Sequence, residues 1–470
     1  MNHRPLPDLT RRHFVRQCCA AVGATGMLSA LAQLRLIGAA AQPSATPAVG
    51  AATSDFKALV CLFLSGGNDA NNLIVPNDSG YAAYASGRGA LALSQGSLLG
   101  ITPATSDGRG WGLHPAVPEL QSLFGGGKAA LLANVGSLVV PTTLAQYNAR
   151  SVPLPPQLFS HSDQQVQWQS SVPDKPFTTG WGGRLADLVN AFNENNTISM
   201  SISLAGKNSF QVGSTVAQYS VNPSGVVQLN GTAGAAGAVR LSAMQDLMSP
   251  TDAGLFATAF GAATGNAIND AALLSGVLGT TPPFTTAFPG STLGQQLRMI
   301  AWLIQVAPQL GLKRQVFFAN VGGFDLHDNQ VSATDTSTGA HATLLADLSA
   351  SLKAFYDATV ELGLAENVTA FTASDFGRTY NTNGDGSDHG WGSHHLVVGG
   401  AVKGGDIYGA MPNLTVNGPD DTGRGRWIPT TSVDEYSATL ARWFGVSDAD
   451  LPLVLPNIGR FAHPNLGFML

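Results

Sequence analysis

Short apolar runs and longer segments with helically spaced apolar residues alternate along the chain. Continuous apolar runs of strand length are typical of strands buried on both faces of a parallel sheet. Residues 199–204 alternate between apolar and polar in the manner of a strand, and another apolar run starts at Leu396. The continuous runs that predict buried strands are residues 58–64, 129–135, 315–321 and 368–372.

Segments with helical spacing lie between these runs, and the alternation of strands with helices indicates an α/β fold with parallel strands. The stretch 206–289 is rich in Gly, Ala, Ser and Thr and carries only short helical patches, so we interpret it as an insertion or cap over the core. The segments predicted to be helical are residues 117–124, 181–192, 241–248, 255–260, 293–310, 342–362 and 432–444, with a further helix entered within 158–168.

The first residues carry an export pattern. Thr10–Val15 contains twin arginines, an uncharged stretch follows, and Ala39–Ala41 offers a small-residue cleavage site before a linker at 42–54. A membrane anchor is the alternative, but glycine and polar residues interrupt the stretch before it reaches the roughly 18 apolar residues of a span. We therefore predict a signal peptide at 1–41, recognition by the twin-arginine export machinery, a periplasmic or secreted protein, and no stable membrane span after processing.

Composition narrows the class of protein. Hydrophobic residues make up 44% and charged residues 11% of the chain, which argues against disorder. The formal charge of −6 gives no sign of the basic face that nucleic-acid binding requires, so we expect no nucleic-acid partner. Removal of the signal would leave Cys61 as the one cysteine, which excludes an intrachain disulfide and favours an inert core thiol.

Three predicted strands end in polar clusters that are candidates for chemistry. The first carries Asp69, the second Asp325 with His327, and the third Asp375, followed by His389. Parallel strands place their carboxyl ends at one edge of the sheet, so these side chains are expected to converge. Carboxylates and imidazoles bind divalent metals, and we predict one or two ions of zinc, manganese or calcium.

Further residues near these clusters leave alternatives open. Ser160, before His161, either caps a helix or acts as a nucleophile or phosphate ligand. Arg378 is placed to neutralise an anionic substrate through its guanidinium. His394 and His395 either supply a ligand or pack in the core, one of them against the nearby tryptophan.

The motif series resembles the domain of unknown function 1501 family, exported bacterial proteins similar to the alkaline phosphatase and sulfatase superfamily. That resemblance covers residues 55–465 and implies a single three-layer α/β/α sandwich with a mostly parallel central sheet, 206–289 being its insertion. The motifs that carry it are Leu64–Asp69, Ser160–His161, Gly323–Gln330, Ser374–Thr379, Asp388–Gly390 and Gly399–Gly405.

The resemblance also implies roles. Ser160 occupies the nucleophile position with His161 beside it, whereas Phe376 stands where the superfamily places a histidine, which departs from a full two-metal site. The residues implied as metal ligands are Asp69, Asp325, His327, Asp375 and His389.

These observations predict an exported metal-dependent hydrolase that cleaves a small anionic phosphate or sulfate ester, using a metal-activated serine or hydroxide. Two alternatives stay open. One is a non-catalytic exported envelope or binding protein with a structural metal. The other is a phosphoryl transferase, since the same site would serve transfer to water or to another acceptor.

Overall fold

The structure is a computed structural model that describes residues 55–105, 107–194, 198–226, 231–232, 234–248 and 254–470. The predicted signal peptide at 1–41 and the linker at 42–54 lie outside the described residues. The described residues separate into two compact units, one holding those within 229–269 and the other those within 55–228 and 270–470. The second unit contains the sheets and the candidate site.

The central sheet has the strand order β11-β5-β10-β9-β1-β8-β6-β7, and β12 also pairs with β5. Every pairing is parallel except those that β10 makes with β5 and β9. The strands are β1 (Lys57–Leu64), β5 (Ala129–Gly136), β6 (Ser201–Ser203), β7 (Tyr219–Ser220), β8 (Arg314–Val321), β9 (Val368–Ser374), β10 (Ser393–Gly399), β11 (Ile407–Tyr408) and β12 (Thr431–Ser432).

A small antiparallel sheet has the order β2-β4-β3, with β2 (Ile74–Pro76), β3 (Leu99–Ile101) and β4 (Trp111–Leu113). The four continuous apolar runs are confirmed as β1, β5, β8 and β9. The alternating run at 199–204 contains the shorter β6, and the run at Leu396 belongs to β10, which starts three residues earlier. Because β10 turns back beside β9, the segment 375–392 returns to the edge at which β9 ends.

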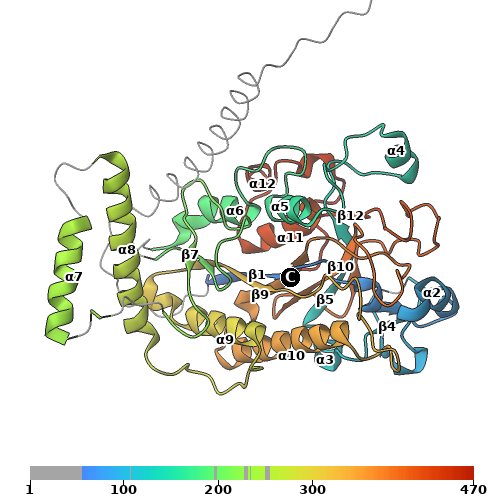
Figure 1. Cartoon of the computed structure of the whole chain (residues 1–470), viewed down its shortest axis with the longest axis horizontal. Helices are drawn as coiled ribbons and strands as arrows, with labels where there is room; N and C mark the ends of the chain where they lie inside the picture. The colour runs from blue at the N-terminus through green and yellow to red at the C-terminus, as the bar shows by residue number, and fades with distance from the viewer. Residues whose placement is uncertain (1–54, 106, 195–197, 227–230, 233, 249–253) are drawn as a thin grey trace, which may run out of the picture. The chain divides into compact units, whose positions relative to one another are not determined.

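Helices cover both faces of the central sheet (Figure 1). On one face lie α3 (Pro118–Gly125), α9 (Thr292–Gln305) and α10 (Ala340–Glu361), and on the other α5 (His161–Ser170), α6 (Trp181–Val189), α11 (Val433–Phe444) and α12 (Leu451–Val454). This is the three-layer α/β/α architecture that we expected. The shorter helices are α2 (Tyr81–Arg88) and α4 (Leu144–Ala149), with 3₁₀ turns at Ala70–Asn72, Gly89–Leu91, Gln95–Ser97, Asn190–Phe192, Ala307–Leu310, Ala365–Asn367 and Ile458–Arg460.

The Gly/Ala-rich stretch contains α7 (Gly234–Met248) and α8 (Leu255–Leu278), so the two predicted patches are parts of longer helices. Its role as an insertion or cap remains a prediction. Within the described residues, no helix is both long and apolar enough to cross a membrane.

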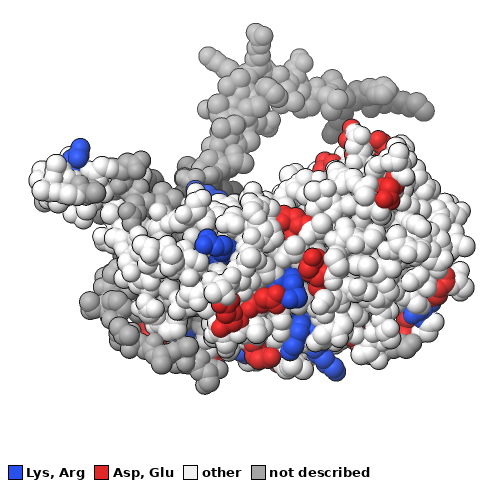
Figure 2. Space-filling model, turned by 90° about the horizontal axis from the view of Figure 1, so that it is seen from below, with Lys and Arg blue, Asp and Glu red and all other residues white. Residues whose placement is uncertain are grey.

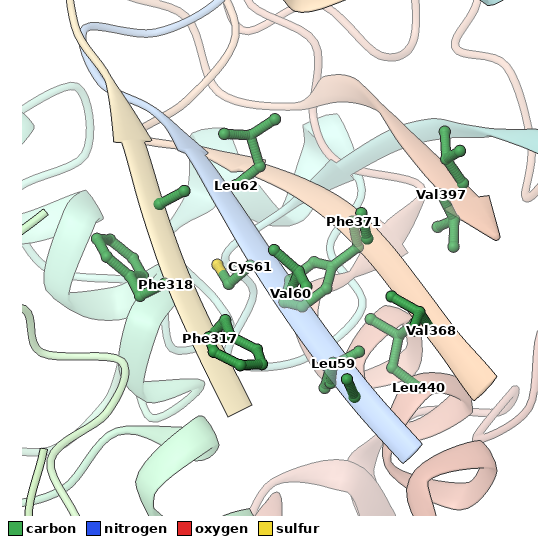
Figure 3. Close-up of a cluster of buried hydrophobic side chains, with 14 of the residues drawn as sticks. Leu59, Val60, Cys61, Leu62, Phe317, Phe318, Val368, Phe371, Val397 and Leu440 are labelled. Carbon is green, nitrogen blue, oxygen red and sulfur yellow. The ribbon is translucent and has the colours of Figure 1, made fainter. Parts of the chain in front are cut away.

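A cluster of buried hydrophobic side chains surrounds β1, which runs between β8 and β9 (Figure 3). Leu59, Val60 and Leu62 are fully buried there, and Leu440 approaches from α11. Cys61 is a buried free thiol, and burial raises the pKa of Cys61 well above its ordinary value, which keeps the thiol protonated. On the face shown in Figure 2, charged side chains are sparse and basic groups lie beside acidic ones.

Asp434, in the first turn of α11, is a buried acid that should make stability depend on pH. Burial raises the pKa of Asp434 from 3.8 to about 7, against the opposing charge of Arg184. The unfolded chain loses this proton near pH 4 while the folded chain keeps it, so stability falls as the pH rises from about 4 to about 7.

We expect Asp434→Asn to stabilise the protein at pH 8 by about 1–4 kcal/mol, at roughly 1.4 kcal/mol per pKa unit, and to change little at pH 4. Denaturant unfolding at both values measures this. An equal effect of the substitution at pH 4 and pH 8 would contradict the titration.

Candidate metal centre

Three imidazoles and one carboxylate meet at the edge where the parallel strands end. His389 Nε2 lies 3.1 Å from His161 Nε2 and 2.9 Å from His327 Nε2. Asp325 Oδ2 lies 3.3 Å from His161 Nε2, and Asp325 Oδ1 lies 3.0 Å from His327 Nε2. Among the described residues, ligand atoms of His161, Asp325 and His389 lie within 4.8 Å of one another, as a metal ion requires. Of the five predicted ligands, Asp325, His327 and His389 come together here.

The other ring nitrogen of each histidine faces an oxygen. The Nδ1 of His161 lies 2.6 Å from Asp375 Oδ2, and that of His327 lies 3.1 Å from Asp388 Oδ1. The Nδ1 of His389 lies 2.7 Å from the carbonyl oxygen of Phe159. A neutral imidazole that donates from Nδ1 has a lone pair on Nε2, and metal-binding histidines show this pattern of outer hydrogen bonds.

These lone pairs provide the test of whether the residues fit a metal ion. When all three imidazoles donate from Nδ1, three Nε2 lone pairs and a carboxylate face one another, and a cation among them would relieve their repulsion. Burial lowers the pKa of His389, and nearby His161 and Arg378 add to the effect, so an imidazolium is disfavoured at this position. The donor set is suited to a divalent metal ion.

Gly66 and Gly67, which follow β1, allow the loops around the centre to approach one another closely. Gly66 has a φ of 113°, and a Cβ there would lie 2.4 Å from the backbone nitrogen of Asp325. Its amide lies 3.2 Å from Asp375 Oδ1, and its carbonyl oxygen accepts from Arg378 Nη1 at 3.1 Å. Only glycine fits this close approach, which connects β1 to the loops after β8 and β9.

Phe376 is an apolar wall of the centre. Its ring centroid lies 4.7 Å from that of His161 and 4.8 Å from that of His389. A Cβ on Gly67 would meet this ring at 2.6 Å, so the second glycine of the pair makes room for it. Where the superfamily resemblance implies a histidine, this chain places a side chain that packs on two imidazoles and donates no ligand atom.

Asp375, predicted as a ligand, is instead fully buried behind His161. Its Oδ2 accepts from His161 Nδ1 and, at 2.8 Å, from Gln165 Nε2. The side chain therefore orients a histidine of the centre.

Arg378, predicted to hold a substrate anion, is buried with all of its groups engaged. It donates to Asp325 Oδ1 at 2.5 Å and to the carbonyl oxygens of Gly66 and Ser387. Burial raises the pKa of Asp325, but the hydrogen bond and charge of Arg378 outweigh it and the net shift is downward. Arg378 thus keeps Asp325 ionised and has no free donor pair for a substrate.

Asp69 lies in a different network from the one expected. Its Oδ2 binds Arg88 and accepts from Gln330 Nε2 at 2.5 Å, and its Oδ1 accepts from Asn71 at 3.1 Å. Burial raises the pKa of Asp69, but the Arg88 charge and these hydrogen bonds lower it overall. Both oxygens of the predicted ligand thus serve a buried ion pair, because α2 places a guanidinium against the end of β1.

Ser160 stands at the N-cap position of α5, yet its side chain forms no capping bond. The hydroxyl donates to Asp163 Oδ2 at 2.6 Å and lies 3.2 Å from Ser162 Oγ. Phe159, the residue before Ser160, has a φ of 73°, which is rare for an aromatic residue. In this conformation its carbonyl oxygen lies within hydrogen-bonding distance of His389 Nδ1. The helix start therefore serves the metal centre through His161 and Phe159.

His394 and His395 belong to β10, and both side chains are buried. The Nδ1 of His394 accepts from the Asn134 amide at 3.0 Å, and the His395 ring lies 4.8 Å from that of Trp168. Burial lowers the pKa of His394 to about 4 and that of His395 to about 3. Of the two alternatives, the structure favours core packing, although against a different tryptophan from the one expected.

Sequence reasoning missed several supporting groups. Asp388 belongs to the Asp388–Gly390 motif, but no sequence pattern indicates that it orients His327. Gln165 lies one helical turn after His161 on α5, so an i, i+4 spacing was the available signal. No local pattern marks the Phe159 carbonyl, because any residue has one.

Comparison with known proteins finds a family model that matches part of the chain. Residues 310–448 match the family described as "Protein of unknown function (DUF1501)", and the matched segment includes Asp325, His327 and His389 but not His161. No curated protein is detectably similar to the chain.

Among solved structures, the chain is similar to one titled as Ps i-CgsB in complex with k-i-k-neocarrahexaose. The identity is 10% and the TM-score 0.35, over 87% of this chain and 77% of the other. It is also similar to the PsFucS1 sulfatase from Pseudoalteromonas sp., with 12% identity and a TM-score of 0.35, over 84% and 68% of the two chains.

Proposed function

We propose that this protein is a metal-dependent hydrolase of a small anionic ester, a phosphate or a sulfate. The observation that supports the proposal is the convergence of three imidazole Nε2 atoms on the Asp325 carboxylate, with each Nδ1 held by an oxygen. The side chains of Asp325 and His327 are each 43% exposed, so the centre is open to solvent on one side.

The ligands proposed are His161, Asp325, His327 and His389. Three of the four donors are imidazole nitrogens, which favours zinc or manganese over calcium, since calcium takes oxygen ligands. When bound, such an ion would polarise an ester oxygen and lower the pKa of a water molecule.

The protein's own groups would hold this centre in position for the reaction. Asp375 and Asp388 fix the tautomer and orientation of His161 and His327. Phe376 excludes water from behind the imidazoles. Ser160 is retained as a candidate nucleophile because its hydroxyl donates to the Asp163 carboxylate, which polarises the oxygen, and because it adjoins His161.

The proposal is tested on the purified mature protein, obtained after export and removal of the signal peptide. Elemental analysis is expected to find zinc or manganese bound, and aryl phosphates, phosphodiesters or aryl sulfates to be hydrolysed. Treatment with a chelator should abolish turnover, and zinc or manganese should restore it better than calcium does. Ser160→Ala separates the two nucleophiles, since it abolishes turnover only if the serine attacks.

Two outcomes would contradict the proposal in different ways. Protein that retains no divalent metal and binds none when it is offered would remove the metal centre. Protein that retains metal but hydrolyses none of these esters would instead favour the non-catalytic alternative, and transfer to an added alcohol without hydrolysis would favour the transferase.

A further inference from the structure

Two arginines project from residues 421–427 toward the metal centre. Arg426 Nε donates to the backbone carbonyl oxygen of His389 at 2.8 Å, and its guanidinium carbon lies 4.8 Å from the centre of the Phe159 ring. Phe159 in turn accepts the Nδ1 hydrogen bond of His389. Arg426 is thus fixed against two residues that shape the centre.

The outer end of Arg426 is free. Across the described part of the chain, its Nη1 and Nη2 atoms form no hydrogen bond or ion pair. A guanidinium held by its Nε and by an aromatic face keeps two parallel donors, a geometry that matches two oxygens of a tetrahedral oxyanion. Because the side chain is already ordered, little conformational entropy is lost when a ligand binds.

Arg424 lies two residues before Arg426 in the same loop. Its Nη1 lies 2.5 Å from Asp388 Oδ2, while the other oxygen of Asp388 holds His327. Its side chain is 45% exposed. A second guanidinium therefore lies one carboxylate away from the most exposed histidine of the centre.

The loop is built to present both arginines. Asp421 is buried, and its Oδ1 accepts from the amides of Gly423, Gly425 and Arg426 at 2.7, 2.8 and 3.0 Å. Arg424 has a φ of 64°, which non-glycine residues rarely adopt. A Cβ on Gly425 would lie 2.1 Å from that of Tyr380, so the loop is pressed against the segment that follows β9.

The local charge favours an anionic ligand. Around the centre, the carboxylates of Asp163, Asp325, Asp375 and Asp388 exceed by one the guanidinium groups of Arg378, Arg424 and Arg426. A divalent cation would therefore leave a surplus of one positive charge, which attracts an anion.

We infer that Arg426, with Arg424 beside it, binds the tetrahedral oxyanion of the ligand, a phosphate or a sulfate group. This inference rests on the proposed function for the chemistry of the site and gives these two arginines the role that was expected of Arg378. The arginine fork, formed by the guanidinium groups of Arg426 and Arg424, recognises the anion. The histidine–aspartate centre supplies the reacting groups.

The test measures anion binding separately from turnover. Isothermal titration of the metal-loaded full-length protein with inorganic phosphate and with inorganic sulfate, together with KM and kcat for aryl esters, is compared among Arg426→Gln, Arg426→Lys and Arg424→Gln. The matched control is Arg109→Gln, because the Arg109–Asp78 pair is exposed to 42% and 21%, much like the 45% and 25% of Arg424 and Asp388.

We expect Arg426→Gln to weaken binding of the preferred anion by about 10- to 100-fold, the range for hydrogen bonds to a charged group, and to raise KM in parallel. Arg426→Lys should retain part of the affinity, Arg424→Gln should lose less, and Arg109→Gln should behave as the unmodified protein. Stronger binding of phosphate than sulfate, or the reverse, identifies the anion.

Each remaining outcome separates this inference from the proposed function. If esters are hydrolysed while Arg426→Gln leaves anion affinity and KM unchanged, the fork is overturned and the hydrolase stands. If no ester is hydrolysed but Arg426→Gln still abolishes anion binding, the fork stands and the hydrolase fails. If Arg426→Gln changes only kcat and metal content, Arg426 merely positions His389, and the inference is overturned.

Discussion

His389→Ala is expected to lose bound metal and ester hydrolysis together. Its Nε2 lies 3.1 Å from His161 Nε2 and 2.9 Å from His327 Nε2, so the substitution removes the central member of the ligand set. Metal affinity should fall by more than the roughly 100-fold that loss of an outer hydrogen-bond partner costs. Metal titration and elemental analysis measure the affinity, and kcat/KM should fall with it.

The metal-free variant provides a second measurement. Without a cation the facing lone pairs are unfavourable, so metal-free His389→Ala should be at least as stable as the metal-free unmodified protein. The unmodified protein should gain stability when metal is added, because a ligand that binds only the folded state stabilises it by mass action, and the variant should gain little. His463→Ala, at an exposed histidine remote in sequence from the centre, is the matched control and should behave normally.

Asp375→Asn distinguishes a ligand from an orienting partner. If Asp375 only holds His161, its replacement should weaken metal binding by about 10- to 100-fold, less than His389→Ala does. Loss of metal as complete as that of His389→Ala would instead make Asp375 a ligand, as the sequence suggested.

Asp69→Ala is expected to destabilise the protein by about 3–5 kcal/mol, the usual result of removing one partner of a buried ion pair. Arg88 is fully buried, and without the carboxylate it keeps only the Asn72 side chain and two carbonyl oxygens, of Thr379 and Tyr380. Denaturant unfolding measures the loss. The control is Arg109→Ala, which removes the cation of the exposed Arg109–Asp78 ion pair and should cost at most about 1 kcal/mol.

The double variant Asp69→Ala with Arg88→Met should recover part of this stability, because it removes the unpaired charge. The stabilisation by Asp69 is present above its ordinary pKa of 3.8 and is lost as the pH falls through the lowered folded-state value. Folded Asp69→Ala protein should still bind metal. A variant of normal stability that binds no metal would restore Asp69 as a ligand.

Much of the scaffold follows from local pattern. Apolar runs such as 58–64 and 315–321 cannot be solvated on either face, so burial in a parallel sheet is the arrangement open to them. That arrangement already requires Asp325, His327 and His389 to approach one edge. The antiparallel direction of β10 was not predictable, because an apolar run reads the same in both directions.

What each side chain does at that edge was decided by tertiary contacts. Asp69, Asp325 and Asp375 all follow strands and look alike in the sequence, but Arg88 pairs with the first, Arg378 and three imidazoles surround the second, and His161 covers the third. Likewise, Arg378 and Arg426 are both arginines near a histidine, but Arg378 donates to Asp325 and two carbonyl oxygens, whereas Arg426 is held by its Nε and keeps its outer nitrogens for a ligand. Residue type and order determine which groups reach the edge of the sheet. The role of each group is set by the partners from remote segments that contact it, because a buried charge must be paired wherever the chain places it.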